Sequence, residues 1–458
     1  KELFGKFEIA KDKDFEKYLN QYNTIFLNMQ EFLSRSHNVE ELIDRVKKLV
    51  IRDLKMEYPE VDYFDDTDLI ECMQDIYAQM QYPFVVIIDE WDCIFREYKQ
   101  DKEAQEKYLD FLRDLLKDKA CIYLSYMTGI LPIKKEKTQS ALNNFDEFTM
   151  LSAGAFASYI GFTDDEVKAL CKNYNKDFEK VKRWYDGYIL EEYQVYNPKA
   201  VVSVLLKGSF KSYWSETASY DAIVPLINMN YDGLKTSIIE MLSGDTIKVN
   251  TTTFRNDTVN FKSKDDVLTY LIHLGYIGYD EVKKSAFIPN EEIRQELKNA
   301  VESKRWNEFD SFQQESENLL DATIDMDSRK VAEQIEKIHL QYVSVIQYNN
   351  ENSLSSVLTI AYLSSMQYYY KPIREMPSGR GFADFVYLPK PEYTDEYPAL
   401  VVELKWNKNA KTAMQQIKDK KYTESLSDYT GNILMVGLNY DRSGKKHECI
   451  IEKYSKNK

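Results

Sequence analysis

The sequence has 458 residues, enough for about two to four domains, and its 43% hydrophobic and 14% aromatic content excludes an intrinsically disordered chain. Five cysteines without a C-x-x-C pair and four isolated histidines exclude a cysteine-rich zinc site, and they are typical of the reducing cytoplasm in which we expect the protein. The net charge of −15 argues against nucleic-acid binding over the whole surface, and no apolar run reaches the roughly 18 residues of a membrane span, so we expect no membrane partner.

The first 155 residues alternate strand and helix patterns, which is typical of an α/β domain with a parallel sheet. Strand patterns cover residues 24–29, 84–88 and 120–129, and a charged helical pattern covers residues 101–119. The second strand pattern is continuously apolar, which predicts a strand buried on both faces. Ligands of such a sheet bind beyond the carboxyl ends of its strands.

Two adjacent acids, Asp89 and Glu90, follow the second predicted strand directly. This is the layout of a Walker B strand, in which the first acid holds Mg²⁺ and the second polarises the water that attacks the γ-phosphate of ATP. A phosphate loop of the form G-x-x-x-x-G-K-[ST] occurs nowhere in the sequence. The segment most similar to one, from Gly437 to Gly444 and Lys445, has the wrong spacing and lacks the hydroxyl residue. The sequence thus predicts one half of an ATPase site.

The middle of the chain is predicted to be a helical lid region at residues 156–245, where Thr163 and Glu166 have the spacing of a capping box. Residues 246–300 resemble a winged helix, with a helix capped by Ser263 and a strand hairpin after it. Winged helices bind DNA or serve as lids and packing modules in ATPases, and because this segment is not basic we favour the packing role.

A helical connector at residues 301–345 leads into a last domain at residues 346–458. Its helix patterns cover residues 351–366 and 411–425, and its strand patterns cover residues 381–388, 399–406, 432–438 and 447–453. The turn at residues 441–444 suits a hairpin between the last two strands. This order predicts a mixed sheet flanked by helices.

Charged residues interrupt two strands of the last domain. Glu403 and Lys405 share one face of the strand at residues 399–406, and if that strand pairs with the one before it, Asp384 faces Glu403. Two carboxylates with an ammonium alongside are typical of an Mg²⁺ or Mn²⁺ site that acts on a phosphodiester. An edge strand with a charged outer face would also explain the pattern. We favour the metal site, because an unpaired charge in a buried strand is costly.

The C-terminal end of the chain is basic although the whole chain is acidic. Residues 404–458 contain 12 lysines or arginines and 6 acidic residues. A solvated lysine-rich surface would explain this composition, and it is also compatible with contacts to the phosphates of DNA, the partner we expect.

The whole chain resembles a prokaryotic family whose members join an AAA-ATPase-like domain to a C-terminal nuclease domain of the PD-(D/E)XK superfamily. The resemblance lies in I-I-D-E-W-D (87–92), T-G-I-L-P-I-K (128–134), W-Y-D-G-Y (184–188), Y-N-P (196–198), L-I-H-L-G-Y (271–276) and I-P-N-E (288–291). The implied fold is an α/β and α+β multidomain chain. It has a truncated P-loop-type parallel sheet, a helical and winged-helix middle and a restriction-endonuclease-like mixed sheet.

In the ATPase-like domain the resemblance implies that Asp89 is the Walker B metal ligand and Glu90 the catalytic glutamate. Thr128 would probe the γ-phosphate, although a strand-end turn with Gly129 explains this threonine equally well. Family members carry the phosphate loop upstream of the segment that resembles residues 3–10, so we interpret this sequence as beginning after that loop. ATP would then be a cofactor of the full-length protein, and we do not expect this chain to turn it over. The ATPase module could also mediate homo-oligomer formation.

In the nuclease domain Asp384, Glu403 and Lys405 fall on the catalytic signature positions of the superfamily, and the first two would bind the metal. Glu351 matches an acid on the first helix. Gln416 matches a polar residue on the following helix that contacts the substrate backbone. These two assignments have a simpler alternative, because a Glu or Gln on a helix surface is usually just solvated.

Three functions are compatible with these patterns. The first is a metal-dependent DNA nuclease coupled to an AAA-type ATPase module. The second is an ATP-binding regulatory protein, or a mobile-element or defence protein, whose nuclease-like domain mainly binds nucleic acid. The third is a degenerate interaction module, and the intact Asp384, Glu403 and Lys405 set argues against it.

Overall fold

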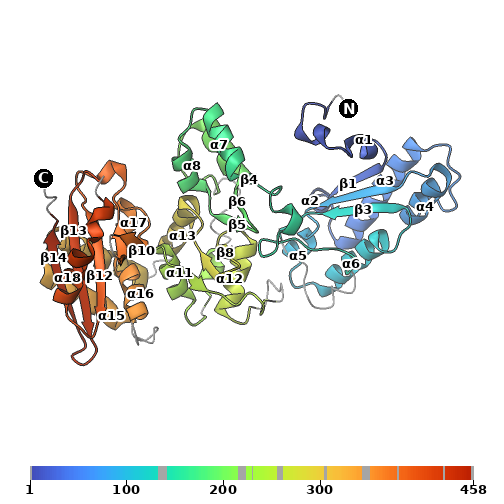
Figure 1. Ribbon diagram of the computed structural model, residues 1–458. Helices are drawn as coiled ribbons and strands as arrows, with labels where there is room; N and C mark the ends of the chain where they lie inside the picture. Colours follow the sequence, from blue (N-terminus) through green and yellow to red (C-terminus); the bar gives the residue numbers. More distant parts are fainter. Residues whose placement is uncertain are drawn as a thin grey trace. The chain divides into compact units, whose positions relative to one another are not determined.

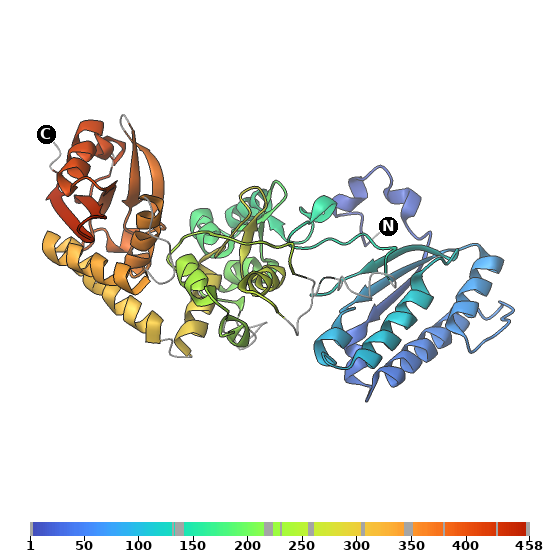
Figure 2. The same ribbon diagram turned by 90° about the horizontal axis from the view of Figure 1, so that it is seen from below.

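The computed structural model of the protein describes residues 3–130, 132, 142–214, 223–229, 231–254, 261–303, 307–342, 351–378, 381–426 and 429–454 (Figures 1 and 2). The chain forms two compact units, residues 1–149 with 252–262 and residues 150–251 with 263–458. None of the helices in the described residues combines the length and apolar character that a bilayer crossing requires.

The first unit is built on a three-stranded parallel sheet in the order β1-β2-β3, as predicted. Its strands are β1 (Asn23–Asn28), β2 (Phe84–Asp89) and β3 (Ile122–Met127). Its helices are η1 (Glu8–Lys11), α1 (Phe15–Tyr18), α2 (Met29–Ser34), α3 (Val39–Glu57), α4 (Leu69–Met80), α5 (Cys93–Glu97) and α6 (Lys102–Leu116). Asn28 and Asp89 are paired in register at the carboxyl edge of the sheet.

One face of this sheet is covered and the other is open. Val86 and Ile88 of β2 belong to one core cluster with the buried residues of α3, α4 and α6. On the opposite face Phe26, Ile87 and Tyr126 stand in one row across the three strands, and Phe26 and Tyr126 are 61% and 41% exposed. The prediction that the second strand is buried on both faces is therefore wrong for one face, because the long helices α3, α4 and α6 pack on the other.

The middle region combines helices with two small antiparallel sheets. Its helices are η3 (Gly154–Phe156), α7 (Asp164–Asn173), α8 (Phe178–Tyr185), α9 (Pro198–Lys207), α10 (Val224–Ile227), α11 (Leu234–Leu242), α12 (Lys264–His273) and α13 (Glu291–Ser303). The sheets have the orders β4 (Phe162–Thr163)-β6 (Tyr193–Tyr196)-β5 (Tyr188–Leu190) and β7 (Ile247–Lys248)-β9 (Ser285–Phe287)-β8 (Gly278–Asp280).

The capping box of Thr163 and Glu166 is present at the start of α7. The region predicted to be a helical lid, residues 156–245, also contains a small sheet, because β4, β5 and β6 pair within it. Helix α12 is followed by the hairpin of β8 and β9, in the order expected of a winged helix.

Three of the sequence motifs that support the family resemblance meet in this region. Gly187 has a φ of +111°, and a Cβ atom there would lie 2.1 Å from the carbonyl oxygen of Pro289, so this position requires glycine. Next to it, the hydroxyl of Tyr188 donates a hydrogen bond of 2.7 Å to the carbonyl of Gly275. These motifs therefore form a packed junction within the middle region.

The C-terminal region is a five-stranded mixed sheet in the order β10-β11-β12-β13-β14, with helices on both faces. The strands are β10 (Ile373–Ser378), β11 (Gly381–Tyr387), β12 (Ala399–Trp406), β13 (Ile433–Asp441) and β14 (Lys446–Lys453). The helices are α14 (Asn307–Ile324), α15 (Ser328–Tyr342), α16 (Glu351–Ala361), α17 (Ser365–Tyr368), η6 (Pro391–Tyr393), α18 (Ala410–Lys420) and η7 (Tyr422–Leu426). Strand β10 was not predicted.

Helix α18 lies close against β13. A Cβ atom at Gly437 would come within 2.9 Å of both the carbonyl oxygen of Ala410 and the backbone nitrogen of Met414, so the glycine allows this approach. After β13 the chain turns at Asp441, whose carboxylate accepts a hydrogen bond of 2.9 Å from the backbone of Gly444. The sequence that imitates a phosphate loop is thus a strand and a hairpin turn.

Candidate active sites

Asp384 and Glu403 lie opposite each other on neighbouring antiparallel strands. The register pairs Phe385 with Val402, and Asp384 and Glu403 come next in that register, just beyond the last paired residues. The Oδ2 atom of Asp384 accepts a hydrogen bond of 2.6 Å from the backbone nitrogen of Leu404, which fixes its carboxylate at this end of the ladder. Since residues directly opposite each other point to the same face, the two carboxyl groups converge.

Glu403 is buried and paired with Lys405. Only 1% of Glu403 and 6% of Lys405 is exposed, and the Lys405 Nζ atom donates to Glu403 Oε1 at 2.6 Å and to the carbonyl of Leu404 at 2.9 Å. The Glu403 Oε2 atom is buried and receives no hydrogen bond from the described residues. Burial, followed by the charge of Asp384, raises the pKa of Glu403 to about 7, although Lys405 opposes this shift. Near neutral pH this carboxyl group can therefore gain or lose a proton.

Gln416 lies on α18 and forms a polar pair with a residue that sequence reasoning missed. Its Nε2 atom donates a hydrogen bond of 2.9 Å to the hydroxyl of Tyr422. Lys421 adopts a left-handed conformation that ends α18, after which the ring of Tyr422 packs into the core. Burial raises the pKa of Tyr422, and the charge of Glu403 adds to the shift. The hydroxyl is thus within electrostatic reach of the carboxylates, and no sequence signal marks it.

The acids here suit a divalent cation with open coordination positions. Glu351 is the first residue of α16, and its side chain lies outside the described part of the structure. Among the described residues, no group of three or more His, Cys, Asp or Glu side chains could hold a metal ion. Asp384 and Glu403 provide two carboxylates, and the described part of the structure gives the Glu403 Oε2 atom no donor. This set fits Mg²⁺ or Mn²⁺, since Mg²⁺ is usually held by one or two carboxylates, water and substrate phosphates.

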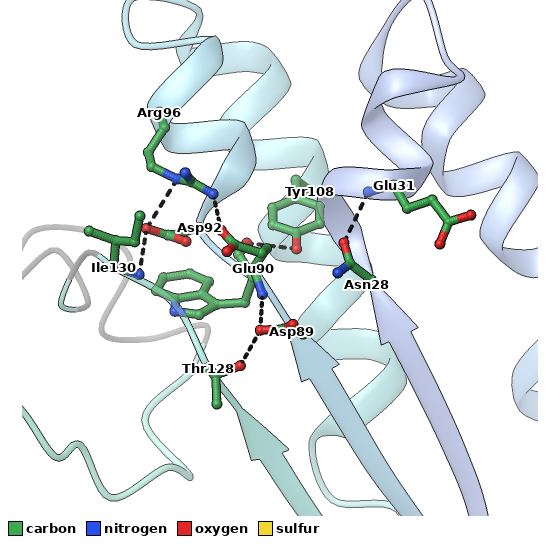
Figure 3. Close-up of polar contacts among 10 residues, drawn as sticks. Asn28, Glu31, Asp89, Glu90, Asp92, Arg96, Tyr108, Thr128 and Ile130 are labelled. Atoms are coloured by element: carbon green, nitrogen blue, oxygen red, sulfur yellow. Dashed lines mark hydrogen bonds and ion pairs between the residues drawn. The ribbon is translucent and has the colours of Figure 1, made fainter. Parts of the chain in front are cut away.

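The second candidate site lies at the carboxyl edge of the parallel sheet, where Asp89 and Thr128 end neighbouring strands (Figure 3). The Asp89 Oδ1 atom accepts hydrogen bonds of 2.6 Å from the Thr128 hydroxyl and 3.0 Å from the backbone nitrogen of Glu90. The Thr128 backbone in turn donates to the carbonyl of Ile88 at 2.9 Å, which extends the pairing of β2 and β3. The predicted metal ligand and the predicted γ-phosphate probe are therefore in direct contact.

Glu90 turns away from the strand into an ion-pair network. Its φ of +55° reverses the chain after β2, a conformation that non-glycine residues seldom adopt. Its carboxylate pairs with Arg96 of α5, whose guanidinium also lies 3.5 Å from the fully buried carboxylate of Asp92 (Figure 3). The backbone nitrogen of Ile130 donates to the same Asp92 carboxylate at 3.2 Å. Sequence reasoning missed Asp92 and Arg96, although their spacing of four residues is that of a helical ion pair.

Two family models match parts of the chain. Residues 1–138 match a family described as a predicted AAA-ATPase, and residues 349–449 match the PD-(D/E)XK nuclease superfamily. A curated relative from Azotobacter chroococcum mcd 1, named an uncharacterized protein in the vnfD 5′ region, is 27% identical over 163 residues. The match covers 34% of this chain and 31% of that protein, so the chain spans about a third of its relative.

Among solved structures, the Aeropyrum pernix ORC2 protein in its ADPNP–ADP complexes matches 65% of this chain and 82% of its own, with 11% identity and a TM-score of 0.23. A likeness at this level supports no conclusion about function. The family models and the two sheets together give the identification. The protein joins a predicted AAA-ATPase domain in residues 1–138 to a PD-(D/E)XK nuclease superfamily domain in residues 349–449.

Proposed function

We propose that the protein is a metal-dependent nuclease that hydrolyses phosphodiester bonds of DNA in its C-terminal domain, coupled to an AAA-type ATPase domain. The observation that carries this proposal is the convergence of Asp384 and Glu403 beside Lys405 at the end of one strand ladder. A buried carboxyl group with an oxygen that lacks a donor is costly, which favours a functional reason for its presence.

In this proposal Asp384 and Glu403 hold Mg²⁺ or Mn²⁺, which would activate a water molecule and polarise the phosphodiester. Lys405 neutralises Glu403 before substrate arrives, and its ammonium can then orient the nucleophilic water or offset charge on the scissile phosphate. Gln416, held by its bond to Tyr422, is suited to contact the substrate backbone. Glu351 retains its predicted role as a further acid.

In the ATPase-like domain, Asp89 would hold Mg²⁺ of bound ATP, Thr128 would contact the γ-phosphate and Glu90 would polarise the attacking water. The pair of Glu90 with Arg96 occupies the carboxylate that this last role needs, so hydrolysis requires that pair to open. We propose ATP as the cofactor of the ATPase-like domain. Self-assembly through this domain, cytoplasmic location and the domain boundaries at residues 155, 245, 300 and 345 stay predictions.

A second candidate function is an ATP-binding regulatory, mobile-element or defence protein whose nuclease-like domain mainly binds nucleic acid. The closed pair of Glu403 and Lys405 favours it, because both side chains are almost fully buried and a substrate phosphate must reach them. Cleavage of DNA separates the two functions.

The test is a cleavage assay on duplex and single-stranded DNA with Mg²⁺ or Mn²⁺. Glu403→Gln and Lys405→Ala should each abolish cutting while the protein stays folded. The sequence offers a matched control, because Glu281 and Lys283 form a second E-x-K group in an exposed turn. Glu281→Gln and Lys283→Ala should cut like the parent. Cutting that survives the Glu403 and Lys405 changes would show that the site is misassigned.

A further inference from the structure

Helix α18 covers the Glu403 side of the proposed nuclease site. Glu403 of β12 and Gly437 of β13 are partners in the parallel register, so both residues point to the same face of the sheet. On that face α18 lies so close that a Cβ atom at Gly437 would come within 2.9 Å of the carbonyl oxygen of Ala410 and of the backbone nitrogen of Met414. The helix therefore packs against the sheet beside Glu403, and a substrate cannot pass between the two.

Tyr422, which follows α18, forms a second cover. It is 1% exposed, and its hydroxyl accepts a hydrogen bond of 2.9 Å from the Nε2 atom of Gln416. Burial raises the pKa of this hydroxyl, and the charges of Glu403 and Asp384 add to the shift, whereas that of Lys405 opposes it. The hydroxyl thus lies near all three charged residues of the site, on the side that α18 occupies.

Of the three charged residues, only Asp384 is partly exposed. Glu403 and Lys405 are 1% and 6% exposed, and the Glu403 Oε2 atom is itself buried. Asp384 lies where the pairing of β11 with β12 ends, although both strands continue beyond this point. A divalent ion shared by the two carboxylates would therefore lie below the surface and be open on the Asp384 side.

The depth of this ion restricts the substrate. Cleavage requires a phosphate oxygen in the coordination shell of the ion, at about 2.0–2.1 Å from Mg²⁺. Duplex DNA is stiff over about 150 base pairs, so its backbone cannot bend sharply into a narrow opening. The backbone of an unpaired strand is flexible and follows the channels and grooves of proteins that bind single strands.

We propose that the nuclease site admits an unpaired DNA strand and excludes an uninterrupted duplex. The burial of Glu403 and Lys405 beneath α18 and Tyr422 carries this inference. It rests on the proposed function, for which it names the class of substrate. Free single strands, bubbles and flaps would be cut, and a closed duplex would be cut only where its base pairs open.

The test compares two circular DNAs that have no ends. A single-stranded circle and a relaxed, covalently closed duplex circle of the same sequence are incubated with the full chain and Mn²⁺ at about pH 8, above the Glu403 pKa of about 7. The duplex is relaxed because negative supercoiling favours strand separation. Each base-pair step that must open slows cutting about tenfold, so a need for two open steps predicts that the single-stranded circle is cut about 100-fold faster or more.

The positions of the cuts give a second readout. A duplex oligonucleotide with a central unpaired bubble should be cut only inside the bubble, and the fully paired oligonucleotide of the same sequence should stay intact. Glu403→Gln should abolish all of these cuts, whereas the control Glu281→Gln, in an exposed turn, should keep them with the same preference.

The outcomes separate this inference from the proposed function. Cutting of the relaxed duplex circle at a rate within about tenfold of the single-stranded circle, less than the cost of one open step, would overturn the inference. Glu403-dependent cuts within the paired arms of the bubble substrate would do the same, and in both cases the nuclease function would stand. If neither circle is cut, the nuclease function itself is wrong, and the inference fails with it.

Discussion

Metal binding at Asp384 and Glu403 should release a proton in a way that depends on pH. Burial and the Asp384 charge raise the pKa of Glu403 to about 7, and a carboxyl group binds Mg²⁺ or Mn²⁺ only in its ionised form. Glu403 is therefore about 90% protonated one pH unit below its pKa and about 10% protonated one unit above it. Metal affinity should fall about tenfold for each unit below about pH 7 and become constant above about pH 8.

Isothermal titration calorimetry in buffers of different ionisation enthalpy counts the released protons. We expect about 0.9 protons per metal ion near pH 6 and about 0.1 near pH 8. Lys405→Ala removes a charge that lowers the pKa of Glu403, so it should shift this profile to higher pH. Glu403→Gln should abolish the release. Equal proton release at both pH values, or release that persists in Glu403→Gln, would refute the reasoning.

Two further predictions concern stability. Burial and a neighbouring histidine lower the pKa of His447 to about 3. Because the folded protein holds this histidine neutral, its contribution to the free energy of unfolding is complete above the unfolded-state pKa of about 6.5. That contribution is lost as the pH falls toward 3, and the free energy of unfolding should be lower by about 2 kcal/mol at pH 5. Urea denaturation at pH 7 and pH 5 should show that His447→Phe removes this loss of stability. The control His37→Phe, at an exposed site, should not remove it. The same acid sensitivity in both variants would count against the role of His447. Gly187→Ala should destabilise the protein by about 2 kcal/mol or more in the same assay, because its Cβ atom would meet a backbone carbonyl at 2.1 Å. Gly208→Ala, whose Cβ atom meets only the tip of a lysine at 3.1 Å, should cost less, and equal losses would contradict this reading.

The sequence predicted the elements whose pattern is local. The apolar run at residues 84–88 marks β2, and the acids after it fall at the carboxyl edge because every strand of this sheet runs in the same direction. The alternation of side chains in residues 399–406 likewise places Glu403 and Lys405 on one face. These predictions succeed because a strand of period two leaves little choice of face.

Features that depend on tertiary contacts were not predictable in this way. Strand β10 contains Pro377, and its pairing with β11 is interrupted at Glu375, whose φ is +47°, so its sequence does not look like a strand. The network of Glu90, Asp92 and Arg96 exists only because a left-handed residue turns β2 directly into α5. Tyr422 reaches the proposed nuclease site only after α18 ends.

The open face of the parallel sheet is also a tertiary property. An apolar run such as that of β2 is typical of a strand covered on both sides, yet coverage depends on where other segments pack. Phe26 and Tyr126 remain exposed on the face opposite α3, α4 and α6. Pattern analysis of the strand alone cannot distinguish these two situations.

The central claim, that Asp384 and Glu403 share one divalent ion, is tested most directly by anomalous diffraction from crystals soaked in Mn²⁺. We expect one anomalous peak between the two carboxyl groups, within about 2.0–2.5 Å of an oxygen atom of each. A Mn²⁺ peak elsewhere in the molecule, or none near these carboxylates in well-ordered density at pH 8, would contradict it.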